Sequence, residues 1–200
     1  FAIYFSPSGN LALDGTQISG NAAENNGTNG LRLAGTLTGA STLNNPGVAF
    51  VVSGGLTVDS GSVLTLAPDT VIKLASAGET LTVNGNLVAN GTEASPVTFT
   101  SFMDDTVAGD TNNNADASSP APMDWNSIVV NPEASVTLTY ANIRYGGWYW
   151  CGVNCYGNHT SILVNSGGIV GMDHVSLAHN GGYGIYVNPS SSSQVTVTHS

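Results

Sequence analysis

Basic residues are almost absent from this 200-residue chain, which contains only Arg32, Lys73 and Arg144. Its formal net charge is −10 at pH 7. Affinity for a phosphate backbone depends on clusters of Lys and Arg, so the composition argues against nucleic-acid binding and against anionic membrane surfaces. The chain also lacks a run of 18 apolar residues, so we expect no membrane insertion.

Charge of either sign is scarce, because Asp, Glu, Lys and Arg together make up only 8% of the residues. Glycine is abundant, with 25 residues, and Asn, Ser and Thr are frequent. The hydrophobic content of 41% argues against a disordered chain. This composition is typical of a protein built from strands and tight turns, and the length allows one domain with a sizeable core.

Cysteine is limited to Cys151 and Cys155, which are separated by three residues in WCGVNCYG. The pair predicts a disulfide that closes a small loop, which would suit an oxidising extracellular location. Two free thiols in a turn are the alternative. A zinc site would need two further ligands, and His159 supplies at most one.

Residues 54–101 contain a dense series of short strands, predicted at 56–58, 63–66, 70–74, 80–83, 86–89 and 97–100. The joints are turn formers such as Asn84-Gly85 and Ser95-Pro96. Within each strand apolar residues alternate with Thr, Asn or Lys, the period of two expected for a strand. The alternation predicts an inward-facing set, which is Leu56, Val58, Leu64, Leu66, Ile72, Leu74, Leu81 and Val83.

Several segments of the chain resemble one another, which is the mark of a repeat architecture. Residues 141–147, 173–182 and 15–21 share a pattern, and the repeat is about 25–35 residues once two excursions are allowed for. Residues 183–190 also match residues 1–8, so the chain begins to repeat its own start. We predict an all-β fold, a single right-handed parallel β-helix over residues 1–200. The insertions are at 102–124 and 146–160, and the segment is expected to be one unit of a longer tandem-repeat chain.

The pattern LTVxSGxxLTLxPxTVIKL at 56–74, followed by LTVNGxLxAxGTxxxPVTFTS at 81–101, resembles a known family. These are the right-handed parallel β-helix repeat proteins of bacterial surfaces, which are related in fold to the pectate lyases. The resemblance covers residues 48–200 well and residues 1–47 loosely. It implies the fold and a secreted or cell-surface location in a bacterium, and it does not imply an activity.

The loop at 104–124 holds five of the nine aspartates, and it is the candidate metal site. Asp110, Asn112, Asn114 and Asp116 place oxygen donors at alternate positions, as in the first half of a calcium loop. Asp104 and Asp105 are further candidate ligands of a structural Ca²⁺ that would order the insertion. Ala115 stands where calcium loops prefer Gly, and no Glu follows, so a solvated acidic loop is the alternative.

A second excursion contains Trp148, Tyr149 and Trp150, whose rings could bind a glycan or form an interface. Alternatively, this excursion folds over the side of the solenoid and buries the rings. The four histidines lie in turns or on outer strand faces, and no two are spaced as ligands on one strand.

The expected function is structural: a rigid rod, filament or adhesin stalk formed by coil-on-coil stacking with identical units. A carbohydrate-binding module is the alternative. A polysaccharide lyase or glycoside hydrolase is a third hypothesis, disfavoured because Lys73 and Arg144 lie far from the acidic loop in the sequence. We therefore do not expect an enzyme.

Overall fold

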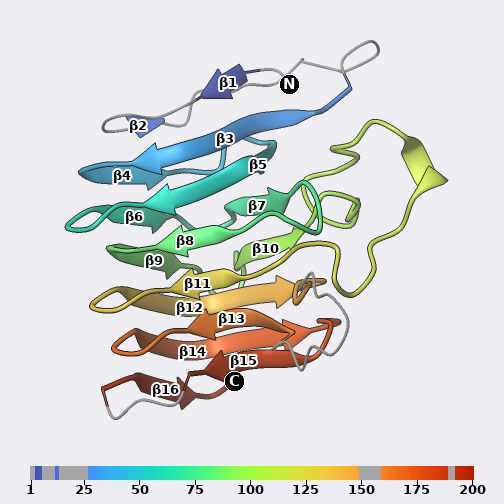
Figure 1. Cartoon of the computed structure of the whole chain (residues 1–200). Helices are drawn as coiled ribbons and strands as arrows, with labels where there is room; N and C mark the ends of the chain where they lie inside the picture. The colour runs from blue at the N-terminus through green and yellow to red at the C-terminus, as the bar shows by residue number, and fades with distance from the viewer. Residues whose placement is uncertain (1–2, 6–11, 14–26, 149–158, 189–191) are drawn as a thin grey trace.

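Parallel strands stacked one above another form the molecule in the computed structural model (Figure 1). The structure describes residues 3–5, 12–13, 27–148, 159–188 and 192–200. The strands are β1 (Ile3–Phe5), β2 (Ala12–Leu13), β3 (Gly30–Leu37), β4 (Ala40–Leu43), β5 (Ala49–Val58), β6 (Val63–Leu66), β7 (Val71–Leu74), β8 (Leu81–Val83), β9 (Asn86–Asn90), β10 (Val97–Ser101), β11 (Ile128–Val130), β12 (Ser135–Arg144), β13 (Thr160–Val164), β14 (Ile169–Ala178), β15 (Tyr183–Val187) and β16 (Gln194–Thr198). The one helical element described is a 3₁₀ turn, η1 (Ala115–Ala117).

Every strand pairing in the described residues is parallel, and the pairings fall into three stacks. The first stack contains β1, the start of β3 and of β5, then β7, β10 and the ends of β12 and β14. The second contains the ends of β3 and β5, then β8, β11, β13 and β15. The third contains β2, β4, β6, β9, the starts of β12 and β14, and β16. From β3 onward the chain visits the three stacks in the same order each time. The predicted all-β class is therefore confirmed, with a parallel sheet.

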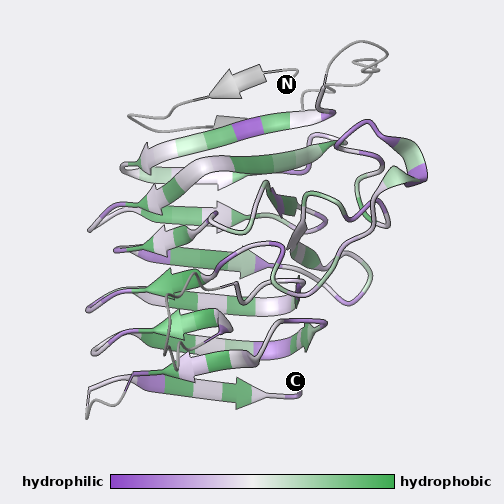
Figure 2. Ribbon diagram, turned by 45° about the vertical axis from the view of Figure 1, so that its right-hand side comes forward, coloured by the Kyte–Doolittle hydropathy of each residue, from purple (hydrophilic) through white to green (hydrophobic). Residues whose placement is uncertain are grey.

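Rows of apolar side chains run along the inside of each stack, because the register keeps equivalent residues above one another. In the first stack Leu31, Phe50, Ile72, Phe99 and Ile143 are consecutive partners, and each is at most 2% exposed. Figure 2 shows the resulting alternation of hydrophobic and hydrophilic residues along the strands. Burying each such side chain stabilises the fold by roughly 1.5–3 kcal/mol.

The strands predicted in 54–101 lie within one residue of β6 to β10 at each end, and the end of β5 is at Val58 as predicted. All eight residues predicted to face inward are at most 1% exposed. Further along the chain, β12 and β14 are ten-residue strands. These strands continue around a corner of the coil, so they belong to two stacks.

The coils are more variable in length than the predicted 25–35 residues. Along the first stack the register advances by 19 residues from Leu31 to Phe50 and by 22 from Phe50 to Ile72. It advances by 44 residues from Phe99 to Ile143, where the insertion at 102–124 intervenes. The minimal coil is thus shorter than predicted, and the insertions account for the longer ones.

One corner of the stack carries a row of asparagines, which we call the asparagine ladder. The Nδ2 of Asn131 donates to Oδ1 of Asn84 at 2.7 Å, Asn165 donates to Asn131 at 2.8 Å, and Asn188 donates to Asn165 at 2.6 Å. Each bond joins neighbouring coils through their side chains, in addition to the backbone ladder. The ladder therefore fixes the register at the corner that follows the second stack.

Candidate functional site

The insertion at 102–124 packs on the outer face of the first stack, and Figure 1 shows it projecting from the side of the stack. The side chains that point outward from this stack include the register partners Val51, Lys73 and Thr100. Each of them is 0% exposed. The backbone of Asn29 also donates to the Thr111 carbonyl of the insertion at 2.7 Å. The strands β7 and β10 are consequently buried on both faces.

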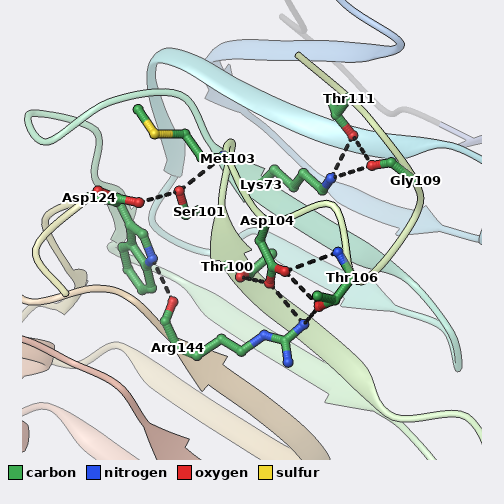
Figure 3. Close-up of polar contacts among 11 residues, drawn as sticks. Lys73, Thr100, Ser101, Met103, Asp104, Thr106, Gly109, Thr111, Asp124 and Arg144 are labelled. Atoms are coloured by element: carbon green, nitrogen blue, oxygen red, sulfur yellow. Dashed lines mark hydrogen bonds and ion pairs between the residues drawn. The ribbon is translucent and has the colours of Figure 1, made fainter. Parts of the chain in front are cut away.

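Asp104 is the centre of a buried polar network at the start of this insertion (Figure 3). Its Oδ2 accepts hydrogen bonds from Thr100 Oγ1 at 2.5 Å and contacts Arg144 Nη2 at 2.8 Å. Its Oδ1 accepts from the Thr106 hydroxyl at 2.6 Å and from the Thr106 backbone N–H at 3.2 Å. The network thereby joins β10, the insertion and β12.

The pKa of the Asp104 carboxyl lies below its usual range. Burial alone would raise this pKa, but hydrogen bonds from Thr100 and Thr106 and the positive charge of Arg144 more than offset burial. Both carboxylate oxygens are occupied by these donors. Asp104, predicted as a calcium ligand, thus has a different set of partners in the structure.

Asp124 holds the other end of the insertion against the same strand. Its Oδ2 accepts hydrogen bonds from Ser101 Oγ at 2.6 Å and from the Ala121 backbone N–H at 2.9 Å (Figure 3). Ser101 Oγ in turn accepts from the Met103 backbone N–H at 3.0 Å. Asp104 and Asp124 therefore attach the two ends of the insertion to β10.

Lys73, on β7, hydrogen-bonds to the middle of the insertion (Figure 3). Its Nζ donates to the Gly109 carbonyl at 2.9 Å and to Thr111 Oγ1 at 2.6 Å, and the residue is 0% exposed. Lys73 and Arg144 were judged remote from the acidic loop because of their sequence positions. That inference was wrong, since the parallel register places both strands beneath the insertion.

Burial lowers the pKa of Lys73 to about 8, and the charges of Asp105, Asp104 and Asp110 only partly offset this effect. The folded state therefore favours the neutral amine more than the unfolded chain does. The ammonium donates both of its described hydrogen bonds to the insertion.

We expect the free energy of unfolding to rise between pH 8 and pH 10.5 because Lys73 loses its proton at a lower pH in the folded state than in the unfolded chain. In this window the unfolded chain binds more protons at this site than the folded state, so the free energy of unfolding increases, by at most roughly 3 kcal/mol. Urea denaturation at pH 7.5, 9 and 10.5 measures this rise. Lys73→Met, which keeps the stem and removes the titrating group, is expected to lack it. Parallel pH profiles for the two proteins would contradict the assignment.

The tip of the insertion is a turn built by Asp110. Its Oδ1 accepts from the Asn114 backbone N–H at 3.2 Å and its Oδ2 from the Ala115 N–H at 2.8 Å. Asn112 and Asn114 lie beside this turn and are half-buried, whereas Asp116 is exposed in η1. Burial raises the pKa of the Asp105 carboxyl, and the negative charge of Asp110 raises it further.

The second excursion is only partly within the described residues. Trp148 is half-buried, and its backbone N–H donates to the Trp125 carbonyl at 2.9 Å. Tyr149, Trp150, Cys151 and Cys155 lie outside the described residues, so the disulfide and the aromatic contact site stay predictions.

Histidines that sequence reasoning treated separately come together at a corner of the last coils. The rings of Tyr140, His174 and His199 stack with centroid distances of 4.4 Å and 4.8 Å. The Oδ1 of Asp173 lies 2.8 Å from His199 Nδ1 and 3.2 Å from His174 Nδ1. Hydrogen bonds from His199 and Thr198 hold the pKa of Asp173 at about 2. The register of β14 with β16 could have revealed this cluster, since it aligns Asp173 with Thr198.

An open cavity of about 600 Å³ borders this histidine stack, with Glu93 and Leu177 also in its wall. The two imidazole rings are only 18° from parallel. Both Nδ1 atoms already face the same carboxylate oxygen. The side chains of Asp173, His174 and His199 therefore form a hydrogen-bonded and stacked corner, and their ligand atoms, all within 4.8 Å of one another, are also spaced as a metal-binding group would be.

The chain matches no protein-family model, and searches of curated proteins and of solved structures likewise gave no match.

Proposed function

We propose that this chain is a segment of a right-handed parallel β-helix and that it serves as a rigid rod, filament or adhesin stalk on a bacterial surface. The repeated passage through three parallel stacks supports the β-helix. The right hand follows from the strong preference of parallel crossover connections for that hand. The resemblance of residues 48–200 to surface β-helix repeat proteins supports the location. The structure has no helix, within the described residues, that is long and apolar enough to cross a membrane.

The observation that carries the proposal is the open end of the inward rows at the last coil. Val164 and Met172 are at most 4% exposed, while their partners on the next coil, Val187 and Val197, are 37% and 50% exposed. Both partners continue the inward row, and no described residue pairs beyond them in that row. A further coil would bury these side chains and pair the open edges of β15 and β16.

The identity of that further coil is suggested by the sequence match between 183–190 and 1–8. Ile185 of β15 corresponds to Ile3 of β1, and β1 pairs with β3 through Ile3 and Leu31. Because β1 lies in the first stack and β15 in the second, the match supports a recurring unit and does not assign the strand that would pair with β15. The partner is another unit of the same kind, joined covalently or by assembly.

We expect the 200-residue chain to associate end to end as its concentration rises, measured by sedimentation velocity and by electron microscopy of particle length. Val197→Lys places a charge in the inward row at the open end, so this variant is expected to remain monomeric. Thr196→Lys is the matched control, because Thr196 points to the opposite face of the same strand and should leave association unchanged.

The rod proposal also makes a prediction for a covalent tandem of two copies. Amide hydrogen exchange in β16 of the first copy should slow by about tenfold or more when a second copy follows, because a docked coil protects the edge. A wild-type chain that stays monomeric, together with unchanged exchange in the tandem protein, would overturn the proposal.

A further inference from the structure

Buried oxygens without hydrogen-bond partners gather around the insertion. In the described residues six buried side-chain nitrogen or oxygen atoms lack a hydrogen-bond partner. Four of them are the carboxylate or amide oxygens Oδ1 of Asn29, Asp105, Asn112 and Asn114. Such oxygens only accept, so each requires a donor or a cation to offset its desolvation.

These four side chains are all anchored to the segment at 110–118 through their other atoms. Asn29 Nδ2 donates to the Asp110 carbonyl at 2.9 Å, and the Asp105 carboxylate accepts a hydrogen bond from the Thr111 backbone N–H. Asn112 Nδ2 and Asn114 Nδ2 both donate to Ser118 Oγ, at 3.0 Å and 2.8 Å. The amide nitrogens are thus used, which fixes the orientation of the amide groups and leaves their oxygens as acceptors.

The charges around this segment favour a cation. Asp105 and Asp110 bring two carboxylates to it, while Asp104 is neutralised by its ion pair with Arg144. Lys73 lies beneath, but its ammonium donates to Gly109 and Thr111 and not to the four oxygens. The segment therefore combines an excess of acceptors with net negative charge.

We propose that Asp105, Asn29, Asn112 and Asn114 bind one Ca²⁺ through their Oδ1 atoms, with backbone carbonyls of the insertion completing the shell. An all-oxygen set of one carboxylate and three amides on an irregular loop suits Ca²⁺, which accepts six to eight oxygens in flexible geometry. Mg²⁺ demands a near-ideal octahedron and is a poorer fit. The low formal charge of the set indicates weak binding, in the range of about 10⁻⁴–10⁻³ M that extracellular calcium modules use.

This site differs from the one expected from alternate spacing alone. It adds Asn29, which precedes β3 and is 81 residues from Asp110 in the sequence. It omits Asp104 and Asp116, the first because its oxygens are occupied and the second because it is exposed in η1. The carboxylate of Asp110 shapes the turn and contributes charge. The ion would join the start of β3 to the insertion and hold the insertion on the first stack.

Calcium binding by the full chain, stripped with EDTA and titrated with CaCl₂ alone, tests the proposal by calorimetry and by thermal unfolding. We expect one saturable site and a melting temperature that rises with Ca²⁺ concentration, with a smaller rise for MgCl₂. Asp105→Asn should weaken Ca²⁺ binding by about tenfold or more, since it removes the only charged ligand. Asp116→Asn removes the same charge from the exposed part of the same loop, and it should change the affinity by less than about twofold.

Absence of saturable binding up to about 5 mM Ca²⁺, above the range of extracellular modules, would overturn the site. Equal losses in Asp105→Asn and Asp116→Asn would also overturn it, because binding would then reflect overall charge. If Asp105→Asn does not fold, Asn112→Ala serves in its place, with the same expected loss of affinity. The inference does not depend on the rod proposal, because end-to-end association is measured with Ca²⁺ absent.

Discussion

Replacing Asp104 with alanine is expected to lower the free energy of unfolding by about 3–5 kcal/mol, one of the two largest effects anticipated for this protein. The carboxylate is fully buried and accepts from Thr100, Thr106 and Arg144. Its removal leaves the Arg144 guanidinium, which is only 24% exposed, without its counter-charge. Equilibrium urea denaturation at pH 7 measures the loss.

Asp116→Ala is the matched control for this substitution. It removes an aspartate from the same insertion, but the residue is exposed, so the expected change is within about 0.5 kcal/mol. Because the pKa of Asp104 is lowered in the folded state, its contribution is fully present above the usual pKa of 3.8. The contribution is lost as the pH falls through the folded-state pKa, so wild type and Asp104→Ala should converge in stability in acid. Similar losses for the two variants at pH 7 would show that the network does not hold the insertion.

Replacing Trp125 with alanine is expected to cost about 3–5 kcal/mol, because it opens a cavity in a rigid site. Trp125 is 0% exposed, and its indole Nε1 donates to the Arg144 carbonyl at 2.9 Å. The ring also fills the space above Gly146, where an added Cβ would lie 2.7 Å from Trp125 Cζ2. The variant loses buried area and leaves a carbonyl without its donor. Denaturation monitored by far-UV circular dichroism measures the loss, since the tryptophan signal itself changes.

Met103→Ala provides the comparison for Trp125→Ala. Met103 is a large apolar residue at the start of the same insertion, but it is 38% exposed. Its truncation is expected to cost less than about 1 kcal/mol. If both substitutions cost the same, Trp125 is not the packing anchor of this region.

The uninterrupted part of the stack was predictable from the sequence because one rule governs it. Between Gly54 and Ser101 the alternation of apolar and polar residues and the turn formers indicate both the strands and their inward faces. The eight inward residues from Leu56 to Val83 confirm this. The rule depends only on local sequence, so it needs no knowledge of distant contacts.

The candidate sites were less predictable, because they depend on which residues the parallel register brings together. Lys73 occupies an outward position of β7, and only the insertion above it makes that position buried. Asn29 and Asp105 meet the segment at 110–118 across long sequence separations. Likewise, His174 and His199 are brought together by the pairing of β14 with β16. A local pattern contains no information on such contacts until the coil lengths are known.

The asparagine ladder gives the molecule a direction. In each of its three hydrogen bonds the residue later in the chain donates and the earlier one accepts. The row therefore ends with an amide oxygen at Asn188 and an amide nitrogen at Asn84. Parallel strands add the same asymmetry to the backbone. The two ends of the stack are therefore different surfaces, and a contact between the end of one unit and the start of the next cannot close upon itself by twofold symmetry. Under the rod proposal such a contact is head-to-tail, and a fibre built this way has distinguishable head and tail ends.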